Sequence, residues 1–125
     1  MKATILGTGS AMPTPSRHHS ATALDIGPEV LLFDCGEGTQ LQLTKAGISH
    51  SKISKIFLTH WHGDHMLGLP GLLQSMELNK RAKPLNIYGS AGSKDRFRKL
   101  VVARLTTVEC YSFPIRSPCI TFVEV

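Results

Sequence analysis

Apolar residues in the first third of the chain fall in short segments, a pattern that is typical of strands. Turn-forming residues, among them Gly27 and Pro28, separate the apolar segments. The strands predicted from this pattern and from later apolar segments span residues 2–6, 20–25, 29–34, 55–59, 85–89, 108–113 and 119–124. We expect the segments 20–25 and 29–34 to form a hairpin.

Helices are expected between the later strands. Residues 37–46 precede Gly47, a common helix-ending residue, although apolar residues alternate within them. Pro70 suits the first turn of a helix to about Leu78, and a third helix is expected from Ser90 to about Arg104. Because strand and helix alternate after a strand-rich start, the expected fold is one α/β domain over residues 1–125, with helices packed on a mixed sheet.

Composition favours a globular, cytoplasmic protein. The chain is 42% hydrophobic and 18% charged, and it has no apolar run of the roughly 18–20 residues that span a membrane. The short apolar run before Gly7 predicts a strand and is too short for a signal peptide. Three cysteines without a CxxC pair indicate reduced thiols, which are typical of the cytoplasm.

The formal charge of +5 is unevenly distributed. Eight of the fourteen basic residues lie between positions 80 and 104, where only Asp95 opposes them: Lys80, Arg81, Lys83, Lys94, Arg96, Arg98, Lys99 and Arg104. A positive field attracts polyanions such as nucleic acid. The simpler interpretation is a solvated helix face, and the few aromatic residues there give little indication of base stacking.

Residues 60–65 read HWHGDH and directly follow an apolar strand. In extended chain, residues two apart point the same way, so His60 and His62 can bind one ion together. Gly63 permits a tight turn, with φ > 0 as one option, which presents Asp64 and His65 elsewhere. The pattern therefore predicts two neighbouring metals, a His pair on one and an Asp–His pair on the other.

Paired metals of this kind suit the hydrolysis of phosphate esters or amides. Imidazole and carboxylate ligands favour zinc, while manganese and iron remain open. Isolated histidines are usually surface or core residues, but four donors in six residues directly after a strand favour a metal site. The helical HExxH zinc motif is absent.

Two features before this motif have alternative interpretations. Asp34 ends an apolar strand before Gly36 and Gly38, which favours capping of the next helix. It could also accept the second imidazole proton of a ligand histidine and orient that ring. The GTGS segment lacks the third glycine of a dinucleotide fingerprint, where Met12 stands, although a phosphate could lie against its backbone N–H groups.

LTHWHGDH is similar to the HxHxDH signature of the metallo-β-lactamase superfamily. Together, ILGTGSAMPTPSR, LLFDCGEGTQLQL, KIFLTHWHGDHMLGLPGLL and LNIYG resemble the ribonuclease Z family of tRNA 3′-processing endonucleases, in register from residue 2 to about 90. The resemblance implies an αββα sandwich, a dinuclear zinc site, a homodimer, and removal of the 3′ trailer from a tRNA precursor. It implies His60 and His62 on one zinc and Asp64 and His65 on the other. Asp64 would also be the general base, with Asp34 orienting a ligand and Arg17 near the RNA.

The family also uses later ligands, yet this chain has no histidine after His65, and Asp95 is its only later aspartate. We therefore expect the N-terminal half of the sandwich, truncated relative to the family, with an incomplete site. Three hypotheses follow: an inactive piece of the enzyme, a nuclease completed by a second copy or a complementing chain, or an inactive RNA-binding or dimerisation module. Half a sandwich should also leave one sheet face uncovered, which favours association.

Overall fold

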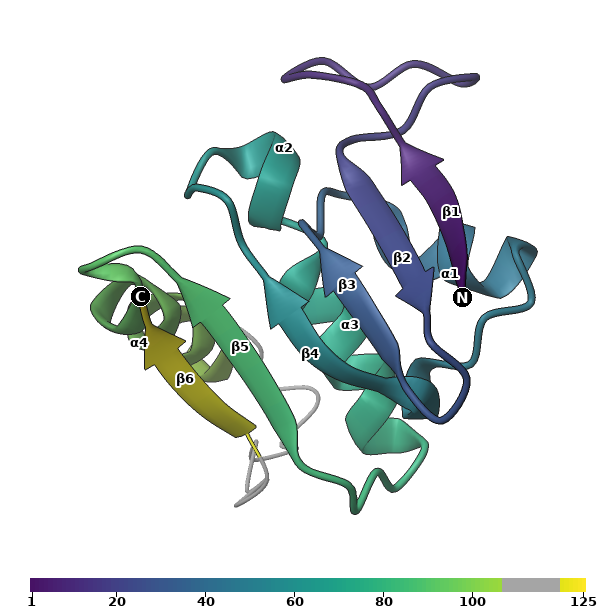
Figure 1. Cartoon of the computed structure of the whole chain (residues 1–125). Coiled ribbons are helices and arrows are strands. Elements are labelled where there is room, and N and C mark those ends of the chain that lie inside the picture. The colour runs from purple at the N-terminus through teal and green to yellow at the C-terminus, as the bar shows by residue number, and fades with distance from the viewer. Residues whose placement is uncertain (107–119) are drawn as a thin grey trace.

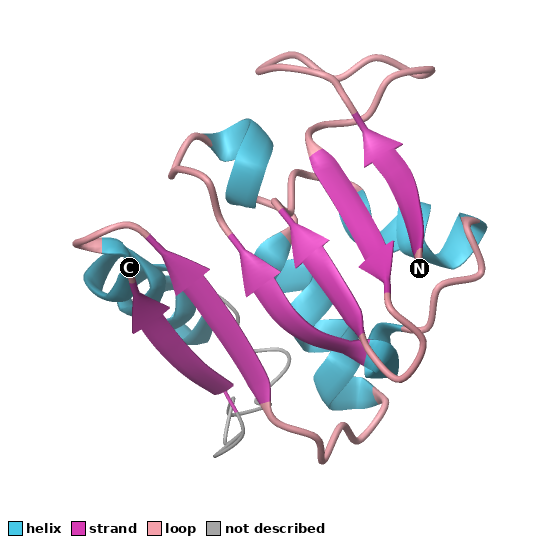
Figure 2. Cartoon of the chain, viewed as in Figure 1, coloured by secondary structure: helices cyan, strands magenta, loops and turns pink. Residues whose placement is uncertain are grey.

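A computed structural model describes residues 1–106 and 120–125 as one six-stranded sheet with helices (Figures 1 and 2). The strands are β1 (Lys2–Gly7), β2 (Ala21–Asp25), β3 (Val30–Phe33), β4 (Ile53–Phe57), β5 (Leu85–Gly89) and β6 (Ile120–Glu124). The helices are α1 (Thr39–Lys45), α2 (Gly63–Met66), α3 (Leu69–Leu78) and α4 (Ser93–Thr106), with a 3-10 turn, η1 (His50–Lys52).

The predicted α/β class with a mixed sheet is confirmed. The three predicted helices correspond to α1, α3 and α4, and the predicted strand over residues 108–113 lies outside the described residues. The helical turn α2 and the 3-10 turn η1 are elements that the sequence did not predict. In the described part of the chain, no helix is both long and apolar enough to cross a membrane.

The strands lie in the sheet in their chain order. The pairs β1–β2 and β2–β3 are antiparallel, as the predicted hairpin requires, while β3, β4, β5 and β6 run parallel to one another. Parallel neighbours need a crossover, and α1, α3 and α4 provide one each. Figure 1 shows these three helices behind the sheet. Because β3 to β6 run parallel, their carboxyl ends share one edge of the sheet.

The core lies between the sheet and these helices. Ala23, Leu32, Ile56 and Ile87 are partners across four neighbouring strands, and none is more than 1% exposed. They form one buried cluster with the apolar residues of α1 and α3, including Leu43, which is fully buried. Burying each leucine or isoleucine of this cluster contributes about 1.5–3 kcal/mol, which fixes the register of the strands that carry the site.

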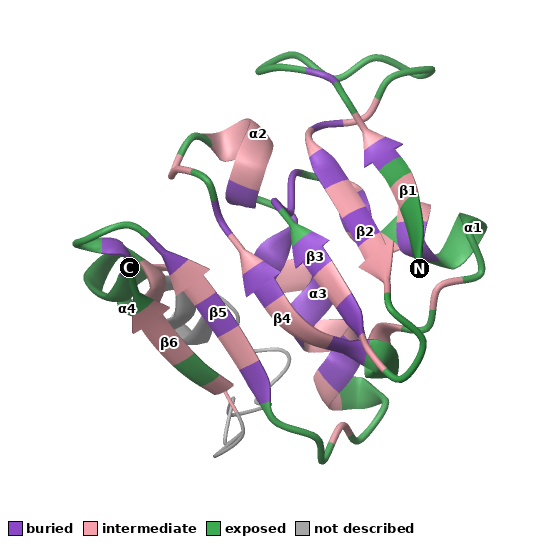
Figure 3. Cartoon of the chain, in the orientation of Figure 1, coloured by how far each residue is buried: buried purple, intermediate pink, exposed green. Residues whose placement is uncertain are grey.

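The opposite face of the sheet carries a continuous row of side chains from the next position on each strand. Its members in register are Ile5, Thr22, Phe33, Phe57, Tyr88 and Val123. The rings of Phe33, Phe57 and Tyr88 stack at centroid distances of 5.1 and 4.7 Å. No element of the described chain covers this face, and Ile5 is 63% exposed (Figure 3).

A polar cluster lies near the start of β3, where this strand pairs with β4. Glu29, just before β3, forms an ion pair with Lys55 of β4 at 2.9 Å and accepts a hydrogen bond from Ser54. The Ser54 hydrogen bond and Lys55 lower the pKa of Glu29 below its ordinary value. The pairing helps to align β4 with β3.

Candidate metal centre

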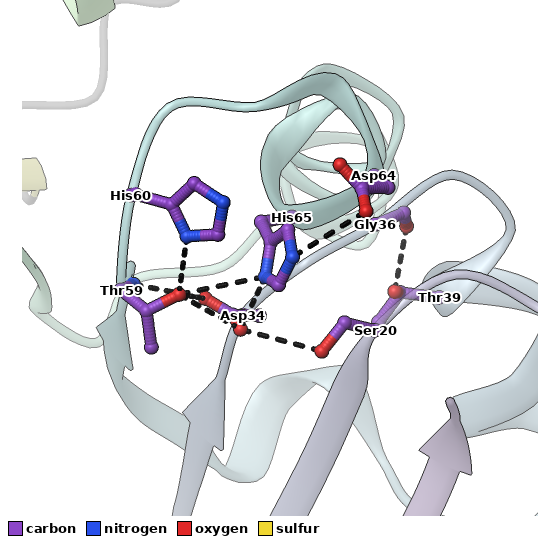
Figure 4. A network of polar contacts seen from close by, with 8 residues as sticks. All are labelled: Ser20, Asp34, Gly36, Thr39, Thr59, His60, Asp64 and His65. Atoms are coloured by element: carbon purple, nitrogen blue, oxygen red, sulfur yellow. Dashed lines mark hydrogen bonds and ion pairs between the residues drawn. The ribbon is translucent and has the colours of Figure 1, made fainter. Parts of the chain in front are cut away.

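The candidate site lies at the carboxyl edge of the parallel strands. Asp34 directly follows β3, and its N–H donates to the carbonyl of Phe57 at 2.8 Å. Thr59 and His60 follow β4, and α2 brings Asp64 and His65 to the same place (Figure 4). The sheet topology therefore gathers residues that are thirty positions apart in the sequence.

Asp34 is the centre of a hydrogen-bond network. Its Oδ1 accepts the backbone N–H of Thr59 at 2.9 Å, and its Oδ2 accepts bonds from Ser20 Oγ at 3.3 Å and His65 Nδ1 at 2.7 Å (Figure 4). The residue is 5% exposed and has a φ of 58°, a left-handed conformation that Asp tolerates better than most residues. The network holds this buried carboxylate in one orientation.

The favoured sequence interpretation of Asp34, capping of the next helix, is wrong. Helix α1 begins after Gly38, whose φ is 82°, and no side chain caps it. The carboxylate instead turns toward β4 and α2 because Thr59 and His65 offer it three donors there. The histidine contact, which was the alternative interpretation, is present in the structure.

This contact determines which ring nitrogen of His65 has a free lone pair. A carboxylate can only accept, so Nδ1 carries the proton that is shared with Asp34. In the neutral ring, Nε2 then carries a free lone pair. That Nε2 lies 3.4 Å from Oδ2 of Asp64, another electron-pair donor.

Thr59 fixes the position of the ring proton of His60 in the same way. Its hydroxyl lies 2.9 and 3.1 Å from the two oxygens of Asp34 and 3.0 Å from Nδ1 of His60. Because the one hydroxyl proton goes to the carboxylate, Oγ1 accepts the Nδ1–H of His60, and the unprotonated Nε2 of that ring keeps a lone pair that can bind a metal. Thr59 had not been identified from the sequence, where a threonine between a strand and a histidine carries no particular signal.

The three histidine rings gather in one cluster. The backbone of His62 is extended (φ −75°, ψ 149°), as the shared direction of His60 and His62 requires, and the two ring centroids are 4.5 Å apart. The His60 and His65 rings are closer still, at 4.0 Å. The expected turn at Gly63 is replaced by the start of α2, so Asp64 and His65 face the same cluster rather than away from it.

These residues fit a metal by the chemistry of their donors. Three imidazoles and a carboxylate suit zinc, and the converging His65 Nε2 and Asp64 Oδ2 are both electron-pair donors. The set remains open: among residues 1–106 and 120–125, no three His, Cys, Asp or Glu side chains are arranged to hold a single ion.

The segment after β3 is joined to α2 and to the residues that follow α2 by backbone hydrogen bonds. Cys35 donates its N–H to the carbonyl of His65 at 2.7 Å and accepts the N–H of Gly68 at 2.9 Å. A Cβ on Gly36 would lie 2.3 Å from the backbone oxygen of Asp64, so only glycine permits this approach. Cys35 is a free thiol, and its complete burial raises its pKa to about 12, which keeps it neutral.

The remaining candidate residues lie outside this cluster. Arg17 is exposed in a turn whose backbone pairs with Thr14 at 3.1 and 3.2 Å, on a loop at the same edge of the molecule as α2 (Figure 1). Arg81 donates to backbone carbonyls of η1 and of Pro84, which indicates a structural role. Four basic side chains of α4 are exposed: Lys94, Arg96, Arg98 and Lys99.

Comparison with known proteins identifies relatives of this arrangement. A model of the family described as Anti-Pycsar protein Apyc1 matches residues 1–107. The ribonuclease Z of Methanothermobacter thermautotrophicus is 55% identical over 92 residues, 74% of this chain and 30% of the relative. The crystal structure of human tRNase Z, short form, superposes with a TM-score of 0.74 at 47% identity, over 83% of this chain and 41% of that one.

A more distant structure shows the fold alone. The metallo-β-lactamase fold protein YhfI of Bacillus subtilis superposes with a TM-score of 0.75 at 20% identity, over 98% of this chain and 44% of that one. The predicted resemblance to ribonuclease Z, a nuclease family, and the predicted metallo-β-lactamase fold are therefore confirmed. The chain spans about 30% of the length of the curated relatives that it matches first.

Proposed function

The chain belongs to the family described as Anti-Pycsar protein Apyc1, within the metallo-β-lactamase fold, and from this premise we propose that it carries the HWHGDH part of a ribonuclease Z-like phosphodiesterase. Its substrate is a tRNA precursor, from which the complete enzyme removes the 3′ trailer in the cytoplasm. We favour ribonuclease Z chemistry because the curated relatives of that name are 50–57% identical to this chain.

The observation that carries the proposal is the Asp34–Thr59 network. It fixes the Nδ1 protons of His60 and His65, so that both rings present Nε2 within one cluster. A histidine that only packs in a core or lies on a surface does not require its ring proton to be fixed on one nitrogen. Buried carboxylates that orient imidazoles in this way are typical partners of metal ligands.

The roles follow from the placement of the donors. His60 and His62 would hold one zinc, and Asp64 and His65 the second, with Asp34 orienting His65. When bound, two such ions polarise a phosphoryl oxygen and lower the pKa of the attacking water. Asp64, whose side chain is 12% exposed, accepts a proton from that water. Arg17 contacts the RNA backbone from its exposed loop.

Two features indicate that other groups complete the enzyme. Four donors for two ions leave coordination positions open, and the sequence has no histidine after His65. The uncovered row that includes Phe33, Phe57 and Tyr88 needs a second apolar layer. We infer that groups outside these 125 residues, from a second copy or another polypeptide segment, supply both ligands and cover, and that the 125-residue segment by itself associates or dissolves poorly.

Cleavage of a pre-tRNA with a 3′ trailer tests this function. The chain is assayed with zinc, alone and mixed with the remaining segment of a homologous ribonuclease Z. The expected result is no cleavage by the chain alone and cleavage after the discriminator nucleotide in the mixture. The variant His62→Ala should abolish the restored activity, and an unaffected variant would contradict the assignment.

An inactive RNA-binding or dimerisation module is the second candidate. The exposed basic side chains of α4 and the open donor set favour it. Such a module would bind RNA with an affinity that falls with salt and is indifferent to a chelator. Zinc-dependent RNA binding would exclude this candidate.

A further inference from the structure

Trp61 stands between the two proposed ligands His60 and His62 and is the only tryptophan of the chain. In an extended segment neighbouring side chains point to opposite sides, so the indole faces away from both histidine rings. Its Nε1–H donates to Oγ of Ser93 at 2.5 Å. Ser93 is the first residue of α4 and is completely buried.

The surroundings of Ser93 are shaped for this contact. A Cβ on Gly89 would lie 2.8 Å from Ser93 Oγ and 3.2 Å from the ring of Phe122, so glycine at the end of β5 leaves room for the serine. The Trp61 ring also lies 6.5 Å from that of Phe122, which is 5.3 Å from Phe97. The indole is thus held by one hydrogen bond and by an apolar cluster.

We propose that Trp61 and Ser93 are positioning residues that set the geometry of the His60–His62 half of the metal site. Asp34 ties the other half, through His65, to β3. The segment from His60 to His62 connects β4 with α2, and the Trp61–Ser93 bond ties it to α4 beside β5. The segment that carries the histidine pair is therefore held at two places, by the Asp34–Thr59 network at the ends of β3 and β4 and by the Trp61–Ser93 bond at α4.

This inference rests on the proposed metal site, and a zinc titration of the full 125-residue chain tests it. The variants are Ser93→Ala and Trp61→Phe, which remove the acceptor and the donor of the bond. Phe97→Leu is the matched control, because Phe97 belongs to the same aromatic cluster through Phe122. Zinc affinity is measured by competition with a chromophoric chelator, and thermal unfolding is followed in parallel.

A second readout needs no metal. Because the chain has one tryptophan, its indole N–H gives a single assignable signal in a nitrogen–proton spectrum. Its hydrogen exchange should be slow in the wild type and Phe97→Leu, and faster in Ser93→Ala. Zinc affinity should fall about tenfold in Ser93→Ala and Trp61→Phe, as for other groups that orient ligands, and stay within about twofold in Phe97→Leu.

These measurements distinguish a failure of the positioning role from a failure of the proposed metal site. If the wild type binds zinc but Ser93→Ala and Trp61→Phe bind it equally well, the positioning role is refuted and the metal site stands. An equal loss of affinity in Phe97→Leu would also refute it, because general packing would then explain the effect. If the wild type binds no zinc while its indole is protected, the metal site itself fails, and the positioning role fails with it.

Discussion

Replacing Asp34 by Asn tests the network at its centre with little change in shape. Asn tolerates the left-handed backbone conformation at this position, where φ is 58°, and its oxygen can still accept the N–H of Thr59. Its amide N–H₂, however, would face Nδ1 of His65, which lies 2.7 Å from Oδ2 in the wild type. The variant therefore favours the tautomer with the proton on Nε2, the nitrogen proposed to bind metal.

The structure sets the expected size of both effects. Loss of a hydrogen bond to a buried charged group costs about 1.5–3 kcal/mol of unfolding free energy. Loss of a group that orients a metal ligand lowers metal affinity about 10–100-fold. We expect zinc affinity to fall in that range and the melting temperature to fall with it.

Chemical denaturation and a zinc competition titration measure these two quantities. Asp25→Asn is the matched control, because Asp25 accepts the N–H of Gly27 in an exposed turn far from the histidines. This control should keep the zinc affinity of the wild type. An Asp34→Asn chain that folds and binds zinc within about twofold of the wild type would refute the orienting role.

Three further changes test the supporting structure. Gly36→Ala should lower the free energy of unfolding by about 1–3 kcal/mol, because its Cβ would meet the Asp64 backbone oxygen at 2.3 Å. The control Gly71→Ala in α3 should cost little, because its Cβ would meet only the flexible end of the Gln40 side chain. Cys35 should resist a thiol reagent at pH 8 until the chain is unfolded, because its pKa of about 12 and its burial keep the thiol neutral and inaccessible. Mass spectrometry locates the modified residue, and modification of Cys35 in the native chain would contradict this. The Ser54 hydrogen bond and the lysine ion pair lower the pKa of Glu29 in the folded chain. The stability that Glu29→Gln removes should therefore be full at pH 7 and vanish as pH falls through that lowered pKa. A difference that is unchanged once the carboxyl is protonated would argue against this linkage.

Strands and helices could be predicted from the sequence wherever the pattern is local. Short apolar segments bounded by Gly27 and Pro28 predicted β2 and β3, and Gly47 and Pro70 predicted where α1 ends and where α3 begins. Helix α2 was missed because four residues are too few for a periodic pattern and because glycine at its first position predicts a turn.

The site was only partly readable from the sequence. The metal-type residues were recognised because four donors lie within six positions. For Asp34, the sequence indicated capping locally and the histidine contact only through the family resemblance, because its partners Thr59 and His65 are 25 and 31 positions away. The Trp61–Ser93 contact joins residues 32 positions apart, so only the fold brings it into view.

The most direct test of the central claim is the zinc content of the purified chain, measured with its pre-tRNA cleavage in the same sample. Our account predicts measurable zinc at fewer than two ions per chain and no cleavage by the chain alone, with cleavage at the tRNA 3′ end when a complementing segment is added. Two tightly bound zinc ions and full cleavage by a monomer of this chain would contradict it.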